Sequence, residues 1–562
     1  MKKIFLIIAP HQDDEISIGG AIIPLLQEQG FVPHVLFSTN GDYRVPVEIR
    51  MREASHALSV LGVKKRNIHI LGYGDTVNSS DHHHIFYSEE TPVTSPAGHG
   101  ETYGSEEYVD YAYLRYRVHS PYIKRFYHRD LAEFLLELRP DIIFCVDFDI
   151  HADHRMLSLS FDHIMGLLLR RENNDYFPQV FKSLSYALSF YSYLDFWQDN
   201  IFSTQRPVAG MLETYDEELM DCSLYTWADR VRFPVPRMCI SNTLSQNLIY
   251  HALKKHRSQW AELQAPRVIN GDCVYWERRT DSLTYCADIR VSSGNAEYLR
   301  DFKLYDVTDI DCTEFLPKNY LWQTDVNDSI RTVRFSWKSP QRIELIRLWG
   351  NIYGGRIEEI AISSSSGETI LYGPLKNNGQ KNDIFLERIC DVQWVEITII
   401  RTVGDEVGLA EVEFFSHIQP PSYMQPFIKC MIDGHFVYDY CIEEHIRQLT
   451  FSVYQYGIQE AVFFSVEKGK SHFEGNILWV HPEDKDILVK AYTNSLVCDI
   501  IKIRRLSKVA LMILWLERFV DRLWWKLRCS QRYISCTYTR VKRLGIKVFA
   551  KKVIRRLCRY PS

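Results

Sequence analysis

Residues 3–15 of the chain read KIFLIIAPHQDDE, an apolar run that ends directly before one histidine and three acidic side chains. A short apolar run bounded by a polar cluster predicts a buried β-strand. The run from Ile4 to Ala9 is shorter than the core of a secretory signal, so we expect a cytoplasmic protein. Placing an imidazole and three carboxylates beside a buried strand is unfavourable unless a cation compensates the charge. The stretch therefore predicts both a first strand and a binding site.

The segments around this stretch alternate between two patterns over about the first 180 residues. Short apolar runs predict further strands at 33–38, 67–71, 141–146 and 182–189, and helical periodicity marks 21–29, 48–61, 130–138 and 155–170. This alternation predicts an α/β, Rossmann-like three-layer domain with a mostly parallel sheet. Ligands bind such sheets at the carboxyl ends of strands. His11 follows the first strand, and His151 and His154 follow the strand that ends at Val146, so we expect them to meet at one edge.

The two clusters contain the ligand types that zinc prefers. Catalytic zinc takes three nitrogen or oxygen ligands and leaves a position for a water, whose pKa falls toward ~7. A neighbouring carboxylate that does not bind the metal can act as the general base. A GxSxG elbow, a GxxxxGK phosphate loop and a GxGxxG motif after the first strand are all absent from the sequence. These absences disfavour a serine nucleophile, an NTPase and a dinucleotide-binding enzyme.

Two separated motifs carry a family resemblance. The first strand runs into PHQDDE at 10–15, and HADH at 151–154 follows a strand that begins RPDIIF; between them lie RMRE at 50–53 and LGYGD at 71–75. In these features the first 285 residues or so resemble the LmbE and PIG-L family of zinc N-deacetylases, which includes GlcNAc-phosphatidylinositol and mycothiol-pathway deacetylases. The resemblance implies Zn²⁺ as cofactor and hydrolysis of the N-acetyl amide of an N-acetylated amino sugar in a glycan, glycolipid or glycoconjugate.

The resemblance also implies roles for individual residues. It makes His11, Asp14 and His154 the zinc ligands and Asp13 the base that activates the metal-bound water. His151 would stabilise the oxyanion or protonate the leaving amine, and Asp153 would orient a histidine. The expected substrate-binding residues are Arg50, Asp75, Asn40 and Asp42. Gln12 stands where the family more often has proline, which affects only the local backbone.

The pattern changes after about residue 282 to short strands at regular spacing, with two of them expected at 331–337 and 343–349, which is typical of β-sandwiches. We expect a deacetylase domain at 1–287, a discoidin-like sandwich at 288–418 and a small immunoglobulin-like β domain at 422–505. The second of these resembles galactose-binding-type domains in its closing motif VGLAEVEFF at 407–415, which implies a carbohydrate ligand. Trp322 and Trp349 are candidates for stacking on sugar, although burial in the core is the simpler expectation.

Charge is distributed unevenly along the chain. The whole sequence has 66 Lys and Arg against 71 Asp and Glu, yet 501–562 alone holds 18 basic residues and only Glu517 and Asp521 as acids. Residues 506–562 predict a basic amphipathic helical tail, because Leu516, Phe519, Val520, Leu523, Trp524 and Leu527 recur at helical spacing. It is too charged to span a bilayer.

We expect this tail to bind an anionic membrane surface, which would place the protein peripherally on the inner face of the membrane. A solvated basic tail or an RNA-binding arm is the alternative, and no nucleic acid is expected. The 13 cysteines form no CxxC pair and indicate neither a disulfide framework nor a zinc knuckle.

Two other functions stay open. One is a catalytically silent, carbohydrate-binding, membrane-attached protein, and the other is a zinc amidase that acts on a non-sugar amide. The intact set of His11, Asp13, Asp14 and His154 favours an enzyme over the first alternative.

Overall fold

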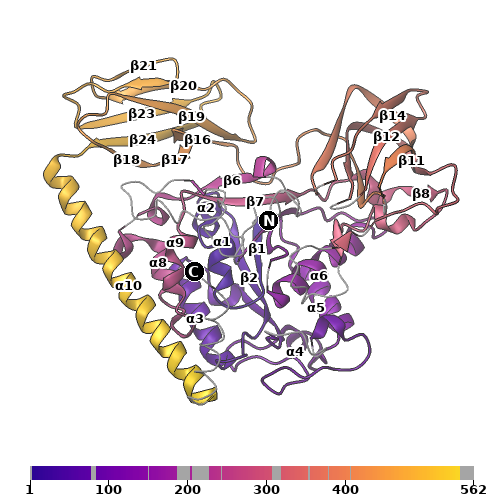
Figure 1. Ribbon diagram of the computed structural model, residues 1–562, viewed down its shortest axis with the longest axis horizontal. Coiled ribbons are helices and arrows are strands. Elements are labelled where there is room, and N and C mark those ends of the chain that lie inside the picture. The colour runs from indigo at the N-terminus through magenta and orange to yellow at the C-terminus, as the bar shows by residue number, and fades with distance from the viewer. Residues whose placement is uncertain are drawn as a thin grey trace, which may run out of the picture.

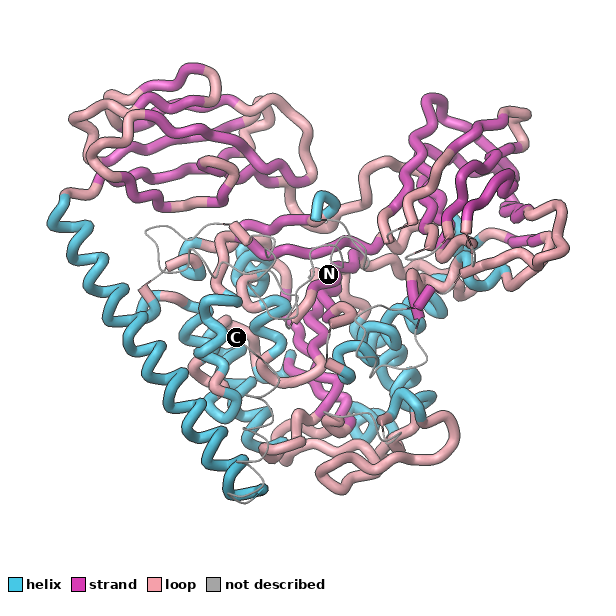
Figure 2. Tube along the Cα trace, in the orientation of Figure 1, coloured by secondary structure: helices cyan, strands magenta, loops and turns pink. Residues whose placement is uncertain are grey.

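The chain folds into three bodies and a long C-terminal helix (Figure 1). The computed structural model describes residues 3–76, 84–149, 151–185, 203–204, 227–241, 243–306, 318–319, 321–351, 355–377, 379–404 and 407–544. Figure 2 shows two groups of strands set apart from the mixed helix and strand body that begins the chain. The predicted multidomain fold class is confirmed: an α/β domain is followed by two β bodies that resemble sandwiches, and by a helix.

A mixed seven-stranded sheet forms the centre of the first body, in the order β3-β2-β1-β4-β5-β7-β6. Its strands are β1 (Ile4–Ala9), β2 (Val32–Thr39), β3 (Ile68–Tyr73), β4 (Ile142–Val146), β5 (Gln179–Ser183), β6 (Val231–Pro234) and β7 (Asp272–Arg278). The strands from β1 to β5 run parallel, and β7 is antiparallel to both of its neighbours, β5 and β6. The strand expected at 182–189 begins earlier, at Gln179, because its apolar pairing partner β4 sets the register; 186–189 lie outside the described residues.

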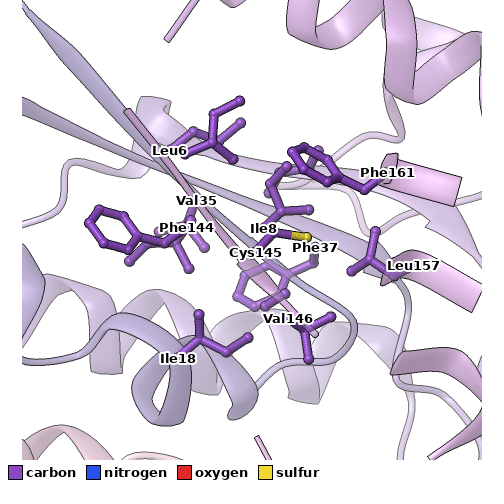
Figure 3. Close-up of a cluster of buried hydrophobic side chains, with 14 of the residues drawn as sticks. Leu6, Ile8, Ile18, Val35, Phe37, Phe144, Cys145, Val146, Leu157 and Phe161 are labelled. Carbon is purple, nitrogen blue, oxygen red and sulfur yellow. The ribbon is translucent and has the colours of Figure 1, made fainter. Parts of the chain in front are cut away.

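Helices cover both faces of this sheet. They are α1 (Asp14–Gly19), α2 (Ile22–Glu28), α3 (Val47–Val60), α4 (Tyr111–Tyr116), α5 (Lys124–Leu138), α6 (Ala152–Leu169), α8 (Leu248–Leu253) and α9 (Ala265–Val268). In Figure 1, α1, α3 and α8 lie on one side of the sheet and α5 and α6 on the other. Because both faces are covered, β1 and β4 are apolar throughout, and Leu6, Ile8 and Phe144 pack in the core that Figure 3 shows.

The second body is a β structure with its own apolar core. Its strands are β8 (Asp288–Val291), β11 (Thr332–Trp349), β12 (Arg356–Ser364), β13 (Thr369–Tyr372), β14 (Lys381–Val403) and β15 (Glu411–Phe415); β9 (Tyr305–Asp306) and β10 (Lys318–Asn319) pair separately. Two strands expected at 331–337 and 343–349 are one strand, β11, with irregular register between Ser336 and Gln341. Trp322 and Trp349 are buried, and the indole N–H of Trp349 donates to Glu413, so neither ring is open to a sugar.

The third body has two sheets around a separate core. One contains β16 (Phe427–Ile432), β17 (His435–Phe436), β19 (Gln448–Tyr456), β21 (His472–Glu474) and β22 (Ile477–Trp479); the other contains β18 (Asp439–Ile442), β20 (Phe463–Lys468), β23 (Asp486–Tyr492) and β24 (Cys498–Arg505). The helix α10 (Lys508–Leu544) leaves this body and runs along the edge of the α/β domain (Figure 1). Among the described helices, none combines the length and apolarity needed to cross a bilayer.

Candidate metal centre

The two sequence clusters meet at one edge of the sheet. Strands β1 and β4 are parallel neighbours, with Ile8 opposite Cys145, so the loops that follow them emerge side by side. His11 lies in the first loop, and His151 caps the N-terminus of α6 in the second, where its Nδ1 accepts a hydrogen bond from the Asp153 N–H at 3.2 Å. The ring of His11 is centred 4.9 Å from that of His151 and 5.3 Å from that of His154.

Three buried side chains converge on a single point. Asp14 Oδ2 lies 3.1 Å from His11 Nδ1 and 3.2 Å from His154 Nε2. The other nitrogen of each ring is hydrogen-bonded to a different carboxylate. His11 Nε2 lies 3.0 Å from Asp153, and His154 Nδ1 lies 2.8 Å from Asp149. With neutral imidazoles that donate to those two carboxylates, the inner nitrogens present lone pairs toward the Asp14 oxygen. A cation, or added protons, must lie between them.

This donor set fits a zinc ion. Two imidazole nitrogens and one carboxylate oxygen are the ligands of many catalytic zinc sites, and tetrahedral bonds of about 2.0–2.1 Å place ligand atoms roughly 3.3–3.4 Å apart. Without a metal, protons balance the negative charge. Burial alone would lower the pKa of His154, but the carboxylates of Asp149 and Asp14 outweigh burial and raise this pKa to about 9. Burial is likewise outweighed at His11, whose pKa is raised well above its usual value by Asp75, Asp14 and Asp153.

Carboxylates and a hydroxyl form hydrogen bonds to the predicted ligands. Ser185 Oγ donates to Asp14 Oδ1 at 2.6 Å, and the Ser185 N–H donates to Asp149 Oδ2 at 3.2 Å, so Ser185 connects Asp14 to the carboxylate that contacts His154. Partners of this kind fix the orientation of a ligating histidine and raise its basicity. The sequence motifs did not predict Asp149 or Ser185, although Asp149 begins a D-x-H-x-D-H pattern at 149–154.

Asp153 is completely buried and accepts several hydrogen bonds. Besides His11, its donors are His84 Nε2 at 2.8 Å and the hydroxyl and N–H of Thr76 at 2.5 Å and 3.1 Å. These bonds hold the pKa of Asp153 well below its usual range despite its burial. His84 belongs to a run of three histidines that predicts nothing in particular, so its place here was not foreseen; His82 and His83 lie outside the described residues.

Asp13 occupies a different environment from its neighbour Asp14. Its side chain is 24% exposed, and its backbone has φ 121°, a conformation that is strained for a residue with a side chain. The Asp13 N–H donates to Glu15 Oε2 at 2.6 Å, and the other Glu15 oxygen lies 2.7 Å from Nε2 of His256, which is 241 residues away. Glu15 and His256 are both fully buried, and no motif pointed to His256.

The pKa values of Asp13 and His151 are shifted in opposite directions. Burial raises the pKa of Asp13, an effect that Arg50 at 3.4 Å partly opposes. Burial, together with the neighbouring His11 and His154, lowers the pKa of His151 to about 3, so this ring is neutral near pH 7. Since its Nδ1 accepts from Asp153 N–H, the hydrogen of the neutral ring is assigned to Nε2.

The expected substrate-binding residues surround this centre. Asp75 Oδ1 lies 3.8 Å from His11 Nε2, and the Asp75 N–H donates to Asp42 Oδ1 at 2.9 Å. The Tyr103 hydroxyl also donates to Asp42. Asn40 is buried and donates to the Gly72 carbonyl, so this side chain joins the ends of β2 and β3.

Among the described residues, two groups have donor atoms within 4.8 Å of one another: His11 with His151 and His154, and His11 with Asp75 and Asp153. All ten residues named from the sequence therefore lie at this edge of the sheet or in the loops that line it. Their individual roles stay predictions.

Several solved structures are similar to parts of this chain. N,N'-diacetylchitobiose deacetylase from Pyrococcus horikoshii is 22% identical with a TM-score of 0.22, over 34% of this chain and 62% of that one. A deacetylase of the teicoplanin biosynthetic pathway is 13% identical with a TM-score of 0.28, over 50% and 99%. A family 32 carbohydrate-binding module of NanJ from C. perfringens, in complex with galactose, is 16% identical with a TM-score of 0.18, over 23% and 92%.

This chain thus spans 62% of the chitobiose deacetylase. No curated protein matches it. Residues 6–165, which include both polar clusters, match the family described as PIG-L: GlcNAc-PI de-N-acetylase. The α/β body that begins this chain is therefore a PIG-L (LmbE-like) deacetylase domain.

Proposed function

We propose that this protein is a zinc-dependent N-deacetylase that hydrolyses the N-acetyl amide of an N-acetylated amino sugar in a glycan or glycolipid. The observation that carries the proposal is the convergence of His11, Asp14 and His154 on one point, with a separate carboxylate, Asp13, beside it on the accessible side. A metal-capable donor set and an independent base are the two parts that amide hydrolysis requires.

Each residue has a definite task in this reaction. A bound zinc ion would act as a Lewis acid on the amide carbonyl and lower the pKa of water toward ~7. Asp13 takes the proton from the attacking water, and burial favours this because it raises the pKa of the carboxyl group. The new C–O bond replaces the C–N bond, and Asp13 returns the proton to the departing amine, so the products are acetate and a free amino sugar.

His151 acts as a neutral hydrogen-bond donor. Its low pKa excludes a protonated ring near neutral pH, and its Nε2–H is directed away from the backbone cap that occupies Nδ1. A donor aimed at the developing oxyanion lowers the barrier without a proton transfer. Of the two roles that the sequence left open for His151, we therefore propose oxyanion stabilisation.

The sugar would be held by the loops around Asp42, Asp75 and Arg50. Carboxylates accept hydrogen bonds from hydroxyl groups, and the pairing of Asp42 with the Asp75 N–H keeps the two loops together. We also propose a carbohydrate ligand for the discoidin-like body, at a surface other than the buried Trp322 and Trp349.

The test is acetate release from a panel of N-acetylhexosaminides, lipid-linked sugars and simple non-sugar acetamides, measured with and without a chelator and after zinc is restored. We expect activity that falls with chelation and returns with zinc. Acetate release from the non-sugar amides alone would mean that the substrate is not a sugar. No acetate release from any member of the panel would favour a catalytically silent binding protein. Activity that is indifferent to zinc removal and replacement would refute the metal mechanism.

A further inference from the structure

Helix α10 has two faces with opposite surroundings. Its inner face lies against the α/β domain, near α8 and α9 (Figure 1). Arg528 forms an ion pair with the buried Glu262 at 2.5 Å and stacks 4.4 Å from the ring of Trp260. Asp521 accepts from the Leu244 N–H at 3.2 Å, and Arg518 is only 7% exposed. The helix is therefore docked on the protein and has a defined rotation about its axis.

This rotation turns an apolar stripe outward. Its six members follow one another at spacings of three or four residues, and each is at least 47% exposed: Val509, Met512, Leu516, Val520, Leu523 and Leu527. At 1.5 Å per residue the stripe is about 27 Å long. In Figure 1 the labelled elements all lie on the inner side of α10. The exposure of all six side chains shows that the described elements leave the stripe uncovered.

The border of the stripe carries positive charge and aromatic rings. Lys508, Arg522 and Lys526 lie along it, with Glu517 on the opposite border. Trp515 and Phe519 stack at 5.4 Å between ring centroids and are both exposed. Aromatic rings and basic side chains beside an apolar face are typical of helices that lie in the interface of an anionic membrane.

We propose that the outward face of α10 binds the surface of an anionic lipid bilayer, with the helix parallel to the membrane and the α/β domain held against it. A second copy of the chain is disfavoured, because three cations and one acid border each stripe, so two paired stripes would both carry a net positive charge. An anionic lipid surface instead complements these cations and buries the apolar side chains. Since vesicle binding is measured without substrate or metal, this proposal stands or falls independently of the proposed reaction.

The test is flotation of the full chain with vesicles of phosphatidylcholine, with and without phosphatidylglycerol. The altered protein carries Leu516→Glu, Val520→Glu and Leu523→Glu, which preserve helix propensity because glutamate is a good helix former. The matched control carries Val326→Glu, Leu371→Glu and Leu496→Glu, three exposed apolar residues of the β bodies, with the same change in charge.

We expect the natural protein and the control to float with anionic vesicles. The stripe variant should bind these vesicles at least about tenfold more weakly. Equal flotation of the stripe variant, or no flotation of the natural protein, would overturn the proposal. Sedimentation velocity provides the third outcome: a dimer that the stripe variant converts to a monomer would make the stripe a self-association surface and refute the lipid assignment.

Discussion

Adjacent aspartates can have different chemistry when the backbone turns between them. Asp14 begins α1 and points into the sheet edge, where two imidazoles and Ser185 surround it. Asp13 has a positive φ, and its own N–H donates to the Glu15 carboxylate. This conformation leaves the Asp13 carboxyl group partly exposed beside Arg50. Two identical side chains are thereby divided into one suited to bind metal and one suited to move a proton.

Substituting each aspartate separates these two roles. Asp13→Asn should lower kcat by about 10²–10⁴ while bound zinc remains near one equivalent, because only the proton acceptor is lost. Asp14→Asn should lose the zinc itself. Steady-state kinetics and elemental analysis of the same preparations measure both quantities, and full activity of Asp13→Asn would contradict its role as the base.

A carboxylate beyond the ligands should tune metal affinity. Asp149 receives the Nδ1 hydrogen of His154, so Asp149→Asn should weaken zinc binding by about 10–100-fold. Competition with a chromophoric chelator measures this affinity. Asp175→Asn is the control, since Asp175 is an exposed partner of Arg139. Equal affinities of the two variants would show that Asp149 does not support the ligand.

At the scale of elements, a segment far along the chain supports the site. The short 3-10 helix Arg257–Gln259 follows α8, and His256 just before it reaches Glu15. Ser258 also donates to Glu53 on α3, which secures the same segment. These contacts connect the last part of the α/β domain to the loop that carries Asp13.

Removing this support should affect both stability and turnover. His256→Ala leaves the buried Glu15 carboxylate without its partner, which should destabilise the fold by about 3–5 kcal/mol, and it should lower kcat through Asp13. His256→Gln restores an N–H donor and should recover part of both losses. Urea unfolding and kinetics measure them, with the exposed His251→Ala as control. Unchanged kcat in His256→Ala would limit His256 to a structural role.

The docking of α10 makes its own prediction. Arg528→Ala removes the ion pair with Glu262 and the contact with Trp260, so the helix should undergo faster amide exchange and earlier proteolysis. Arg522→Ala changes an exposed arginine six positions earlier on the same helix and should leave both unchanged. Equal protection in the two variants would mean that other contacts dock the helix.

At the scale of the whole molecule, the first core extends past the domain boundary expected at residue 287. Phe302, Leu304 and Tyr305 belong to the core of the α/β domain. The Tyr305 hydroxyl donates to Asp147 at 2.9 Å, and Arg278 donates to the Phe302 carbonyl. These residues follow β8, which pairs with β11 of the second body, yet they pack in the core of the first body.

Truncation tests this packing. A chain that ends at residue 287 should unfold at a lower temperature than one that ends at residue 306, because it lacks three buried side chains worth about 1.5–3 kcal/mol each. Thermal unfolding of the two proteins compares them directly. Equal melting temperatures would support residue 287 as an independent boundary.

The sequence by itself determined the strand before His11, the alternating α/β pattern, the two polar clusters and the amphipathic tail. These are local features: side-chain periodicity reports which face of an element is buried, and strand ends report where ligands bind. The strand β11, Thr332–Trp349, shows the limit of this reasoning, because in the sequence a bulge within one strand looks like the gap between two strands.

Only the tertiary structure decided which distant side chains complete the site. His256 meets Glu15 across 241 residues, Ser185 joins Asp14 to Asp149, and His84 reaches Asp153. A tertiary contact also determines which face of α10 is exposed, because the ion pair of Arg528 with Glu262 fixes the rotation of the helix. Such contacts depend on how whole elements pack, and no local pattern records that packing.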